Sequence, residues 1–379
     1  MQRMTRRIFS ELNQRLDVQP ISWNTVGNCY TELGPNELQL LTQPFAARSN
    51  AMAHPEWRGE DPFTEFFRML RRRRFDLDRE IGAADVFFVP DIFRDGRRHA
   101  LPAFLKRMPA RSVAIFHDAT DLRLTDVYPD REWKSRPYLE ALALFDLVIC
   151  VSGEARDDLH YFWKKYGCDA TETAVELWPG ELDGAEPATA VDESNSSLLY
   201  VSSFHGRKNH LKLLDAAEQL WCEGLQFELT LIGRNVGAPL NKIVRKIWKL
   251  RMRGRPLHWL RHVNDETLLR AYRECRFTVY PSLMEGFGLP ITESLLHGKP
   301  CLCGGNGALG EVARGGGCLI VDQTKTTALA EGIRKLLLDR QLYSRLADEA
   351  RGRKFRTWSD YIKKLLGYLQ VTKSALASY

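Results

Sequence analysis

Short apolar runs alternate with amphipathic segments along almost the whole chain, and this alternation restricts the possible folds more than any other feature. The apolar runs predict buried strands at 18–23, 85–90, 112–118, 146–152, 198–203, 227–233, 258–263, 277–282, 299–303 and 318–322. Helical patterns lie between them, for example EARDDLHYFWKKYG after Ser152. Strands that alternate with helices predict parallel sheets with helices packed on them, which is an α/β fold.

A change in composition divides the chain into two halves. The stretch PGELDGAEPATAVDESNSS is acidic and rich in small residues, Pro and Gly, as is typical of a linker. With 379 residues the chain is long enough for two domains. We predict two doubly wound, Rossmann-like domains, 1–183 and 198–352, joined by a linker at 184–197 and facing each other across a cleft. A C-terminal helix within 353–379 is expected to pack back toward the first domain.

The first domain begins unusually. Its opening stretch, RMTRRIFSELNQRL, is already helical in pattern. A doubly wound domain normally starts with a strand and a Gly-bearing loop. Either this domain lacks its first strand, or the stated start lies downstream of the true one.

The bulk composition favours a cytoplasmic protein without a resident metal or cofactor. The apolar segment YLEALALFDLVICVSG contains Glu140 and Asp146, so no membrane-spanning helix is expected, and MQRMTRRIF is too polar for a secretory signal. The eight cysteines are scattered, as reduced thiols would be, and CLC at 301–303 has no neighbouring Cys or His to complete a metal site. The net charge of +6 suits an anionic ligand or an anionic membrane surface.

The stretch EGFGLPITE places Glu285 and Glu293 eight positions apart around a Gly-rich loop. Pro290 is expected to open a helix, where its missing N–H costs nothing. Glu285 would then follow the strand at 277–282, and Glu293 would lie in the first turn of the helix. Both carboxylates would border one space into which the free N–H groups of the helix start point. Such a space suits a ligand that is anionic and rich in hydroxyl groups, such as a nucleotide sugar.

Basic residues follow two other strands of the second half. The strand at 198–203 is followed by Gly206, Arg207 and Lys208. A guanidinium beside an ammonium can hold a diphosphate, although a solvated basic loop is the alternative reading. The strand at 227–233 similarly ends in Gly233, which Arg234 follows.

These pieces together resemble a known family. GRKN, LIG, the run DETLLRAYRECRFTVYPSLMEGFGLPITESLLHGKPCLC and ALGEV are similar to the nucleotide-binding half of a GT-B glycosyltransferase of family 4. AIFHDATDL and LVICVSGEARDDL in the first half also resemble that family. The similarity covers residues 84–360, and Glu285 and Glu293 match the family's Glu-x7-Glu motif.

The resemblance implies a role for each matched residue. Glu285 would accept hydrogen bonds from the hydroxyl groups of the donor sugar, and Glu293 would hold the ribose hydroxyls. Arg207 and Lys208 would neutralise the diphosphate leaving group, in place of a metal. His117 and Asp118 would face the donor across the cleft, although a strand-end histidine with local hydrogen bonds is the alternative for His117. The main chain of Gly286, Phe287, Gly288 and Leu289 would approach the sugar and phosphates, and that of Val263 would meet the base. Gly206, Gly233 and Arg234 would also take part in binding the nucleotide sugar.

The implied function is that of a metal-independent, retaining glycosyltransferase. It would move a sugar from a nucleotide diphosphate donor to a hydroxyl of a saccharide or lipid-linked saccharide, in the synthesis of bacterial surface polysaccharide such as lipopolysaccharide. GDP-mannose is the first donor expected, followed by UDP- and dTDP-sugars, and no nucleic acid partner is expected. The alternatives are a sugar-nucleotide 2-epimerase, which is not expected to carry the EGFGLPITE loop, and a catalytically degenerate nucleotide-sugar-binding protein.

Three other motifs have simpler explanations. DLD at 76–78 imitates an Asp-x-Asp metal motif, but it follows a basic run and predicts a charged helix or loop. That run, RRRR at 71–74, lies near several phenylalanines and could rest on anionic lipid at the inner face of a membrane, or form a solvated helix face. GGNG at 304–307 and GGG at 315–317 lack the order of a dinucleotide fingerprint and predict turns beside strands.

Overall fold

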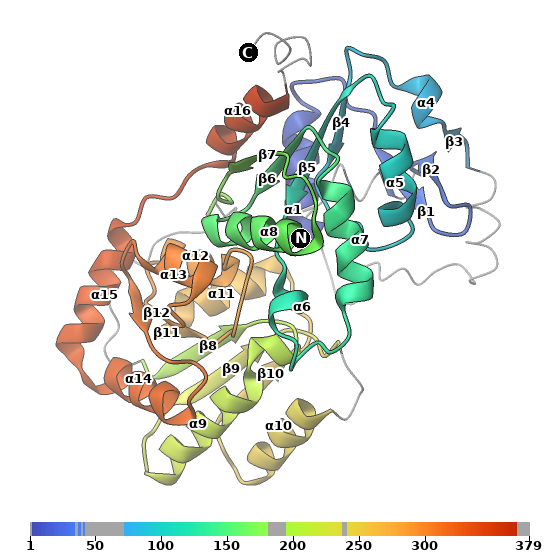
Figure 1. Ribbon diagram of the computed structural model, residues 1–379. Helices are drawn as coiled ribbons and strands as arrows, with labels where there is room; N and C mark the ends of the chain where they lie inside the picture. Colours follow the sequence, from blue (N-terminus) through green and yellow to red (C-terminus); the bar gives the residue numbers. More distant parts are fainter. Residues whose placement is uncertain are drawn as a thin grey trace.

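The protein consists of two α/β bodies, one above the other in Figure 1. The computed structural model describes residues 2–34, 37–38, 41, 72–180, 195–236 and 241–369. The upper body contains the first half of the chain together with the helix at 358–369, and the lower body contains the rest of the second half. The predicted architecture of two Rossmann-like domains is therefore confirmed. Most of the linker predicted at 184–197 and the last ten residues lie outside the described residues.

The C-terminal domain is built on a parallel sheet of six strands. In spatial order these are β10 (Leu257–Leu260), β9 (Glu228–Ile232), β8 (Ser197–Val201), β11 (Phe277–Tyr280), β12 (Cys301–Cys303) and β13 (Cys318–Ile320). The chain moves outward from β8 to β10 and then crosses to the other side of β8. The strand order therefore reverses between β8 and β11, and ligands of doubly wound sheets bind at this switch point.

Helices connect these strands and cover both faces of the sheet (Figure 1). They are the 3-10 turn η1 (Gly206–Lys208), α9 (His210–Cys222), α10 (Lys242–Met252), α11 (Asp265–Glu274), α12 (Leu289–Leu296), α13 (Gly307–Ala313), α14 (Thr326–Leu338) and α15 (Arg340–Gly352). All four residues of β11 are buried, because a central parallel strand has helices on both faces.

The N-terminal domain has a parallel sheet of four strands within the described residues. They follow one another in space as in sequence: β4 (Val86–Val89), β5 (Arg111–Phe116), β6 (Leu147–Cys150) and β7 (Glu172–Val175). Right-handed crossovers that all advance in one direction place their helices on one face of the sheet. Figure 1 shows this face toward the viewer, covered by α5 (Arg97–Leu105), α7 (Glu132–Leu142) and α8 (Gly153–Tyr166).

The opposite face of this sheet is covered by the two ends of the described chain. α1 (Gln2–Leu12) and α16 (Trp358–Leu369) pack against each other, and Figure 1 shows α1 behind the strands and α16 at the upper left. In α1, Met4, Ile8 and Leu12 recur every four residues and are buried, which is the apolar stripe of an amphipathic helix. α16 is tied to the sheet, because Nε of Arg111 in β5 donates a hydrogen bond to the carbonyl oxygen of Tyr368 at 3.1 Å.

The strand expected at 18–23 is present but does not join the parallel sheet. β1 (Ile21–Asn24) pairs in antiparallel orientation with β2 (Cys29–Glu32), and β2 pairs with β3 (Arg74–Phe75). The reason is a tight turn, in which Oδ1 of Asn24 accepts hydrogen bonds from the N–H groups of Val26 and Gly27 at 3.0 and 2.9 Å. The turn folds the chain straight back into a hairpin, so the prediction of a buried strand at this position was wrong.

The structure shows what the motifs at 76–78, 71–74, 304–307 and 315–317 form. Asp76 caps the short helix α4 (Leu77–Glu80), and Asp78 forms an ion pair with Arg107 at 2.7 Å, so the charged helix predicted at DLD is confirmed. Of the basic run, Arg72 and Arg73 are paired with Glu37, Glu32 and Glu80, while Arg71 and the nearby phenylalanines lie outside the described residues. The Gly-rich stretches at 304–307 and 315–317 form the turns beside β12 and β13. Within the described part of the chain, no helix is both long and apolar enough to cross a membrane.

Candidate active site

Two loops meet at the switch point of the C-terminal sheet. One follows β8 and contains η1, and the other, residues 281–288, joins β11 to α12. They are tied together by a hydrogen bond of 2.8 Å from the N–H of Leu283 to the carbonyl oxygen of Arg207. Nδ2 of Asn306, at the start of α13, donates to the carbonyl oxygen of Leu283 at 2.8 Å and braces the second loop from below. The carboxyl ends of three strands therefore converge on one spot.

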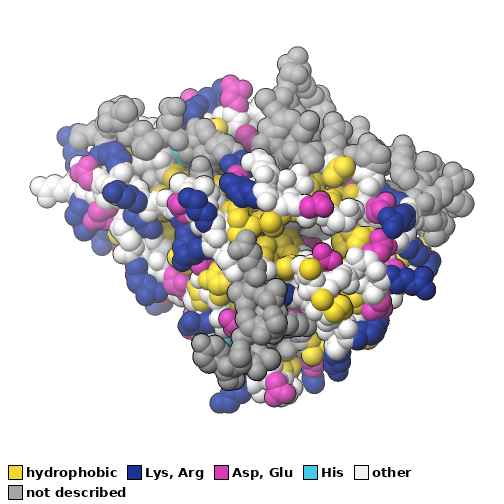
Figure 2. All heavy atoms as spheres, turned by 90° about the horizontal axis from the view of Figure 1, so that it is seen from above, with side chains coloured by type: hydrophobic (Ala, Val, Ile, Leu, Met, Phe, Trp, Pro, Cys, Tyr) yellow, Lys and Arg dark blue, Asp and Glu magenta, His cyan; other side chains and the backbone are white. Residues whose placement is uncertain are grey.

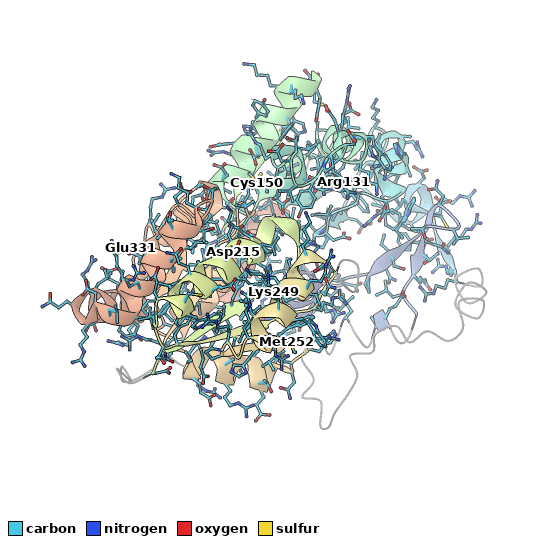
Figure 3. All side chains as sticks on the ribbon, turned by 90° about the horizontal axis from the view of Figure 1, so that it is seen from below. Arg131, Cys150, Asp215, Lys249, Met252 and Glu331 are labelled. Atoms are coloured by element: carbon cyan, nitrogen blue, oxygen red, sulfur yellow. The ribbon has the colours of Figure 1, made fainter. Side chains whose placement is uncertain are left out.

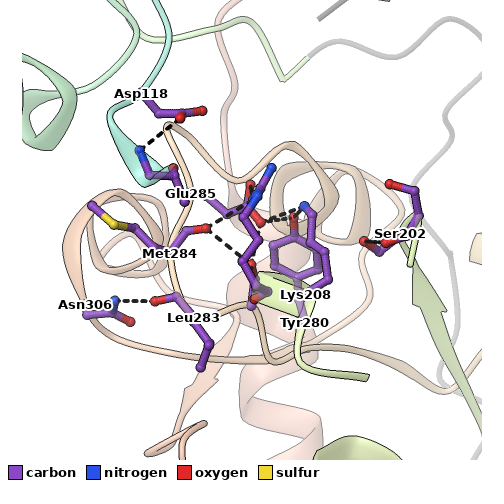
Figure 4. A network of polar contacts seen from close by, with 12 residues as sticks. Asp118, Ser202, Lys208, Tyr280, Leu283, Met284, Glu285 and Asn306 are labelled. Atoms are coloured by element: carbon purple, nitrogen blue, oxygen red, sulfur yellow. Dashed lines mark hydrogen bonds and ion pairs between the residues drawn. The ribbon is translucent and has the colours of Figure 1, made fainter. Parts of the chain in front are cut away.

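An ion cluster lies at this spot, with the carboxylate of Glu285 at its centre (Figure 4). Its Oε1 lies 2.6 Å from Nζ of Lys208 and 3.0 Å from the hydroxyl of Tyr280, and its Oε2 is paired with the guanidinium of Arg207. The hydroxyl of Ser282 also donates to Oε1. The side chain of Glu285 is only 9% exposed, so these interactions act in an environment with little screening by water.

Burial and charge set the protonation states in this cluster. Burial raises the pKa of Glu285, but Lys208 and Arg207 outweigh it and bring the pKa down from 4.5 to about 2. Burial also lowers the pKa of Lys208, and Glu285 only partly offsets this. For Arg207 burial again opposes the charge, yet Glu285 and Asp118 raise the pKa overall. At neutral pH the cluster therefore carries a carboxylate and a permanently charged guanidinium.

Glu293 belongs to a separate network. It is the fifth residue of α12 and lies in the second turn, so the prediction that it lies in the first turn was wrong by one turn. The helix begins at Leu289, one residue before Pro290, because Gly288 takes a φ of +118° and turns the chain into the helix. The hydroxyl of Tyr272 in α11 donates to Oε2 of Glu293 at 2.7 Å.

The N-terminal domain packs directly on the loop that carries Glu285. A Cβ atom on Gly286 would lie 1.9 Å from the carbonyl oxygen of His117, so only glycine fits there. The hydroxyl of Ser152 donates to the carbonyl oxygen of Gly286 at 2.7 Å. On the other loop, a Cβ atom on Gly206 would lie 2.7 Å from Cγ1 of Val127. The domain contact therefore runs through the two loops of the ion cluster.

A carboxylate of the C-terminal domain also caps a helix of the N-terminal domain. Glu311 in α13 accepts hydrogen bonds from the N–H groups of Gly153 and Glu154 at 3.0 and 2.6 Å. These groups open α8, whose end is a favourable place for negative charge. Ser152 caps the same helix through a bond of 3.0 Å from the N–H of Ala155. The start of α8 is thus a second point at which the domains are held together.

His117 is held by local partners. Its Nε2 lies 2.8 Å from the carbonyl oxygen of Pro90, and its ring stacks on Trp178 with 5.8 Å between ring centroids. Burial lowers the pKa of His117, which keeps the imidazole neutral at pH 7. The structure therefore shows the local hydrogen bond that the sequence analysis kept as the alternative, and the carbonyl of His117 rather than its ring meets the Gly286 loop. The neighbouring Asp118 accepts a hydrogen bond of 3.0 Å from the N–H of Thr120.

The remaining predicted residues occupy the rim or the core. Gly233 takes a φ of +146°, and a Cβ atom there would lie 2.1 Å from the carbonyl oxygen of Ser202. Arg234 is exposed, and the side chain of Val263 packs on a small apolar cluster below the rim. Phe287 is buried in the core and Leu289 is packed against it, so these two residues can contribute only main-chain groups to a ligand.

Several residues in and around the ion cluster were not predicted from the sequence. Tyr280 is the last residue of β11 and Ser282 follows two positions later, and this place at the carboxyl end of a buried strand could have identified them. Ser152, Glu311 and Tyr128, whose phenol lies beside the guanidinium of Arg207, act across the domain boundary. Nothing in the local sequence indicates a contact of that kind.

Known proteins resemble this chain in sequence. Residues 185–353 match the family Glycosyl transferases group 1. The serotype-specific mannosyltransferase WbdA of Escherichia coli is 28% identical over 251 residues, which cover 59% of this chain and 31% of that protein. The O-antigen chain mannosyltransferase B of Escherichia coli is 28% identical over 260 residues, covering 65% of this chain and 66% of that protein. This chain thus spans less than the full length of either relative.

A solved structure shares the fold of both domains. The sucrose-phosphate synthase of Thermosynechococcus elongatus superimposes with a TM-score of 0.62 at 18% identity, covering 78% of this chain and 74% of that chain. At this level of identity the likeness concerns the GT-B fold alone. The superposition extends beyond the length of either domain, so it includes residues of both.

Proposed function

We propose that this chain, a group 1 glycosyltransferase of the GT-B fold, transfers mannose from a nucleotide diphosphate donor to a saccharide hydroxyl. The observation that carries the proposal is the ion cluster of Arg207, Lys208 and Glu285 at the switch point of the C-terminal sheet. Nucleotides bind such sheets at this point. The mannose is proposed because both relatives are named as mannosyltransferases.

Arg207 and Lys208 would stabilise the diphosphate leaving group. When the bond between sugar and diphosphate breaks, negative charge builds on the phosphate oxygens. Arg207 offers a planar fork and Lys208 a point charge, and both are mostly shielded from water, with side chains 21% and 11% exposed. Fixed charges in such a place stabilise the transition state more than the same charges would in water. We therefore propose that the reaction needs no metal ion, and activity is expected to persist in EDTA.

Glu285 changes partners in this proposal. A diphosphate placed on Arg207 and Lys208 would compete with the carboxylate for the same N–H groups. Glu285 would then turn toward the sugar, where it can accept hydrogen bonds from hydroxyl groups. Because its pKa is about 2, it stays ionised at neutral pH and can also stabilise positive charge on the sugar ring. We propose that the acceptor hydroxyl attacks from the face that the diphosphate leaves, so that the configuration is retained.

The acceptor enters from the N-terminal domain in this scheme. The loops after β4 and β5 lie opposite the ion cluster, since His117 at the end of β5 touches Gly286. An acceptor bound between these loops and the cluster would present its hydroxyl to the sugar. We propose a saccharide or lipid-linked saccharide of a bacterial surface polysaccharide, in keeping with the O-antigen named for one relative. Guanine is the first base to test, with GDP-mannose as the donor.

The test is turnover of GDP-mannose with a mannose-bearing acceptor, measured as GDP release, with the product's anomeric configuration read by NMR. Arg207→Ala should lower kcat by about 10²- to 10³-fold, while Arg207→Lys, which keeps the charge, should lose less. Lys212→Ala is the control, because it also removes one positive charge, and Lys212 is exposed on α9 outside the ion cluster. Full turnover of Arg207→Ala at saturating donor would refute the assignment. Release of a 2-epimer instead of a glycoside would refute the transferase.

A further inference from the structure

The helix α10 has one face that the C-terminal domain does not use. Its inner face packs into the domain through Ile243, Val244, Ile247 and Leu250, all buried. The helix lies against α9 and the edge strand β10. Figure 1 shows it at the lower side of the molecule, away from the domain boundary. The outer face of α10 therefore lies apart from the ion cluster.

The outer face of α10 combines large apolar side chains with basic ones. Trp248 is 58% exposed and Met252 is 83% exposed, and the two lie one helical turn apart. Lys242, Arg245, Lys249 and Arg251 are exposed around them. Figure 3, seen from below, shows Lys249 and Met252 on this helix. Side chains of this size gain nothing by standing in water, so their exposure together indicates a contact surface.

The charge on this face is not neutralised by neighbours. Within the described residues, the ion pairs of the region are those of Lys246 with Asp215 and Glu218 and of Arg253 with Glu218, and the four outer cations have none. From 229 to 264 the chain has nine Lys and Arg residues and no Asp or Glu, more positive charge than the net +6 of the whole chain. On the face seen in Figure 2, by contrast, acidic side chains stand among the basic ones.

We propose that the outer face of α10 docks the C-terminal domain on an anionic lipid bilayer. Four unpaired cations match a layer of negatively charged headgroups, each contributing about fivefold in affinity near such a surface. Trp248 suits the headgroup level, where indole rings prefer to lie, and Met252 extends beyond it into the apolar edge of the bilayer. A nucleic acid would attract the same cations but would leave Met252 in water. This combination favours lipid over other polyanions.

The proposal concerns a different surface from the ion cluster and does not depend on the sugar or base of the donor. None of the outer residues of α10 contacts Arg207, Lys208 or Glu285 in the structure. Substitutions on this face should therefore leave turnover of a water-soluble donor and acceptor unchanged. Membrane binding and catalysis can thus be measured independently of each other.

The experiment is sedimentation of the full chain with vesicles of phosphatidylcholine alone or mixed with phosphatidylglycerol. The parent should bind only the anionic vesicles, and salt should weaken binding because headgroup attraction is screened. Lys249→Glu combined with Arg251→Glu should lower the vesicle affinity at least about thirtyfold, from about fivefold per basic residue lost. The matched control is Lys354→Glu combined with Lys363→Glu, which changes the charge equally at exposed positions elsewhere. It should bind within about threefold of the parent.

A second variant tests the apolar part. Trp248→Ser with Met252→Ser keeps every charge. It should lower the affinity for anionic vesicles, and the binding that is left should be abolished by salt. Thermal unfolding of each variant checks that the exposed substitutions leave the fold intact. No sedimentation of the parent with anionic vesicles would overturn the proposal, as would equal losses in the two charge-reversed variants. Binding of the parent to duplex DNA but not to vesicles would assign the face to nucleic acid instead and would equally overturn it.

Discussion

Replacement of Gly286 by alanine tests whether the domain contact at the ion cluster matters for catalysis. The new Cβ atom would lie 1.9 Å from the carbonyl oxygen of His117 and 3.0 Å from Cβ of Asp118. Carbon and carbonyl oxygen approach no closer than about 3.3 Å even in favourable contacts. The two loops must therefore separate by about 1.4 Å at this point. His117 follows β5, whose six residues are all buried, so the strand behind it cannot give way.

The displacement should be taken up between the domains and not within them. The bond of 2.7 Å from the hydroxyl of Ser152 to the carbonyl oxygen of Gly286 would then stretch or break. A misplacement of about 1 Å at a reacting centre can cost about 10²-fold in rate. We expect kcat to fall by about that factor. Affinity for free nucleoside diphosphate should hardly change, since Arg207, Lys208 and Glu293 all lie within the C-terminal domain, whose internal packing is expected to stay intact.

The assay combines steady-state GDP release with calorimetric titration of GDP. Gly352→Ala is the matched control, because a Cβ atom at Gly352 meets nothing within 4 Å. It should leave both quantities as they are in the parent. If kcat of Gly286→Ala stays within about threefold of the parent, the closed contact seen here is not the arrangement in which the reaction occurs.

Three further predictions follow from the carboxylates. Glu293→Gln weakens a contact present before and during the reaction, so KM for the donor should rise with little change in kcat, whereas Glu285→Gln should lower kcat more than donor binding; equal losses of GDP affinity in both variants would contradict this division. Because the pKa of Glu285 falls from 4.5 to about 2 in the folded protein, its contribution to stability is complete above pH 4.5 and is lost as the pH falls toward 2. In urea titrations the free energies of unfolding of the parent and Glu285→Gln should therefore converge over that range, and a constant difference would argue against an ionised Glu285. Glu311→Gln removes a charge from the start of α8 and should favour an open arrangement of the domains, seen as a larger radius of gyration in X-ray scattering; an unchanged radius together with unchanged kcat would show that this contact does not hold the domains.

The sequence predicted the buried strands well, for a physical reason. Central parallel strands such as β6 and β11 are covered on both faces, so they read as unbroken apolar runs, and the structure places them within two residues of the predicted bounds. β7 was missed because Glu172–Val175 lies at the edge of its sheet and none of its residues is fully buried. β2 and β3 were missed because short antiparallel strands carry little apolar pattern.

The same distinction applies to the site. The proximity of Arg207, Lys208 and Glu285 could be predicted, because each follows a strand of one sheet and the carboxyl ends of parallel strands meet at one edge. The direct pairing of Glu285 with both cations was not predicted, since the resemblance assigned them to different parts of the donor. The contacts of Gly286 with His117 and of Glu311 with Gly153 depend on how two separately folded sheets are placed. No local pattern records that placement.

The position of α16 has a consequence for how the protein is made. Its Trp358 and Tyr361 are buried against Trp178 of the N-terminal domain, and Glu176 beside them pairs with Arg356 and Lys364. In the sequence, the entire C-terminal domain lies between Trp178 and α16. The ribosome therefore synthesises that domain after Trp178 and before α16. Domains usually fold in order as they are synthesised. Here α1 alone covers one face of the first domain's sheet until α16 emerges. The nascent chain should therefore depend on chaperones through most of its synthesis, and the second domain should be the first to reach its native state.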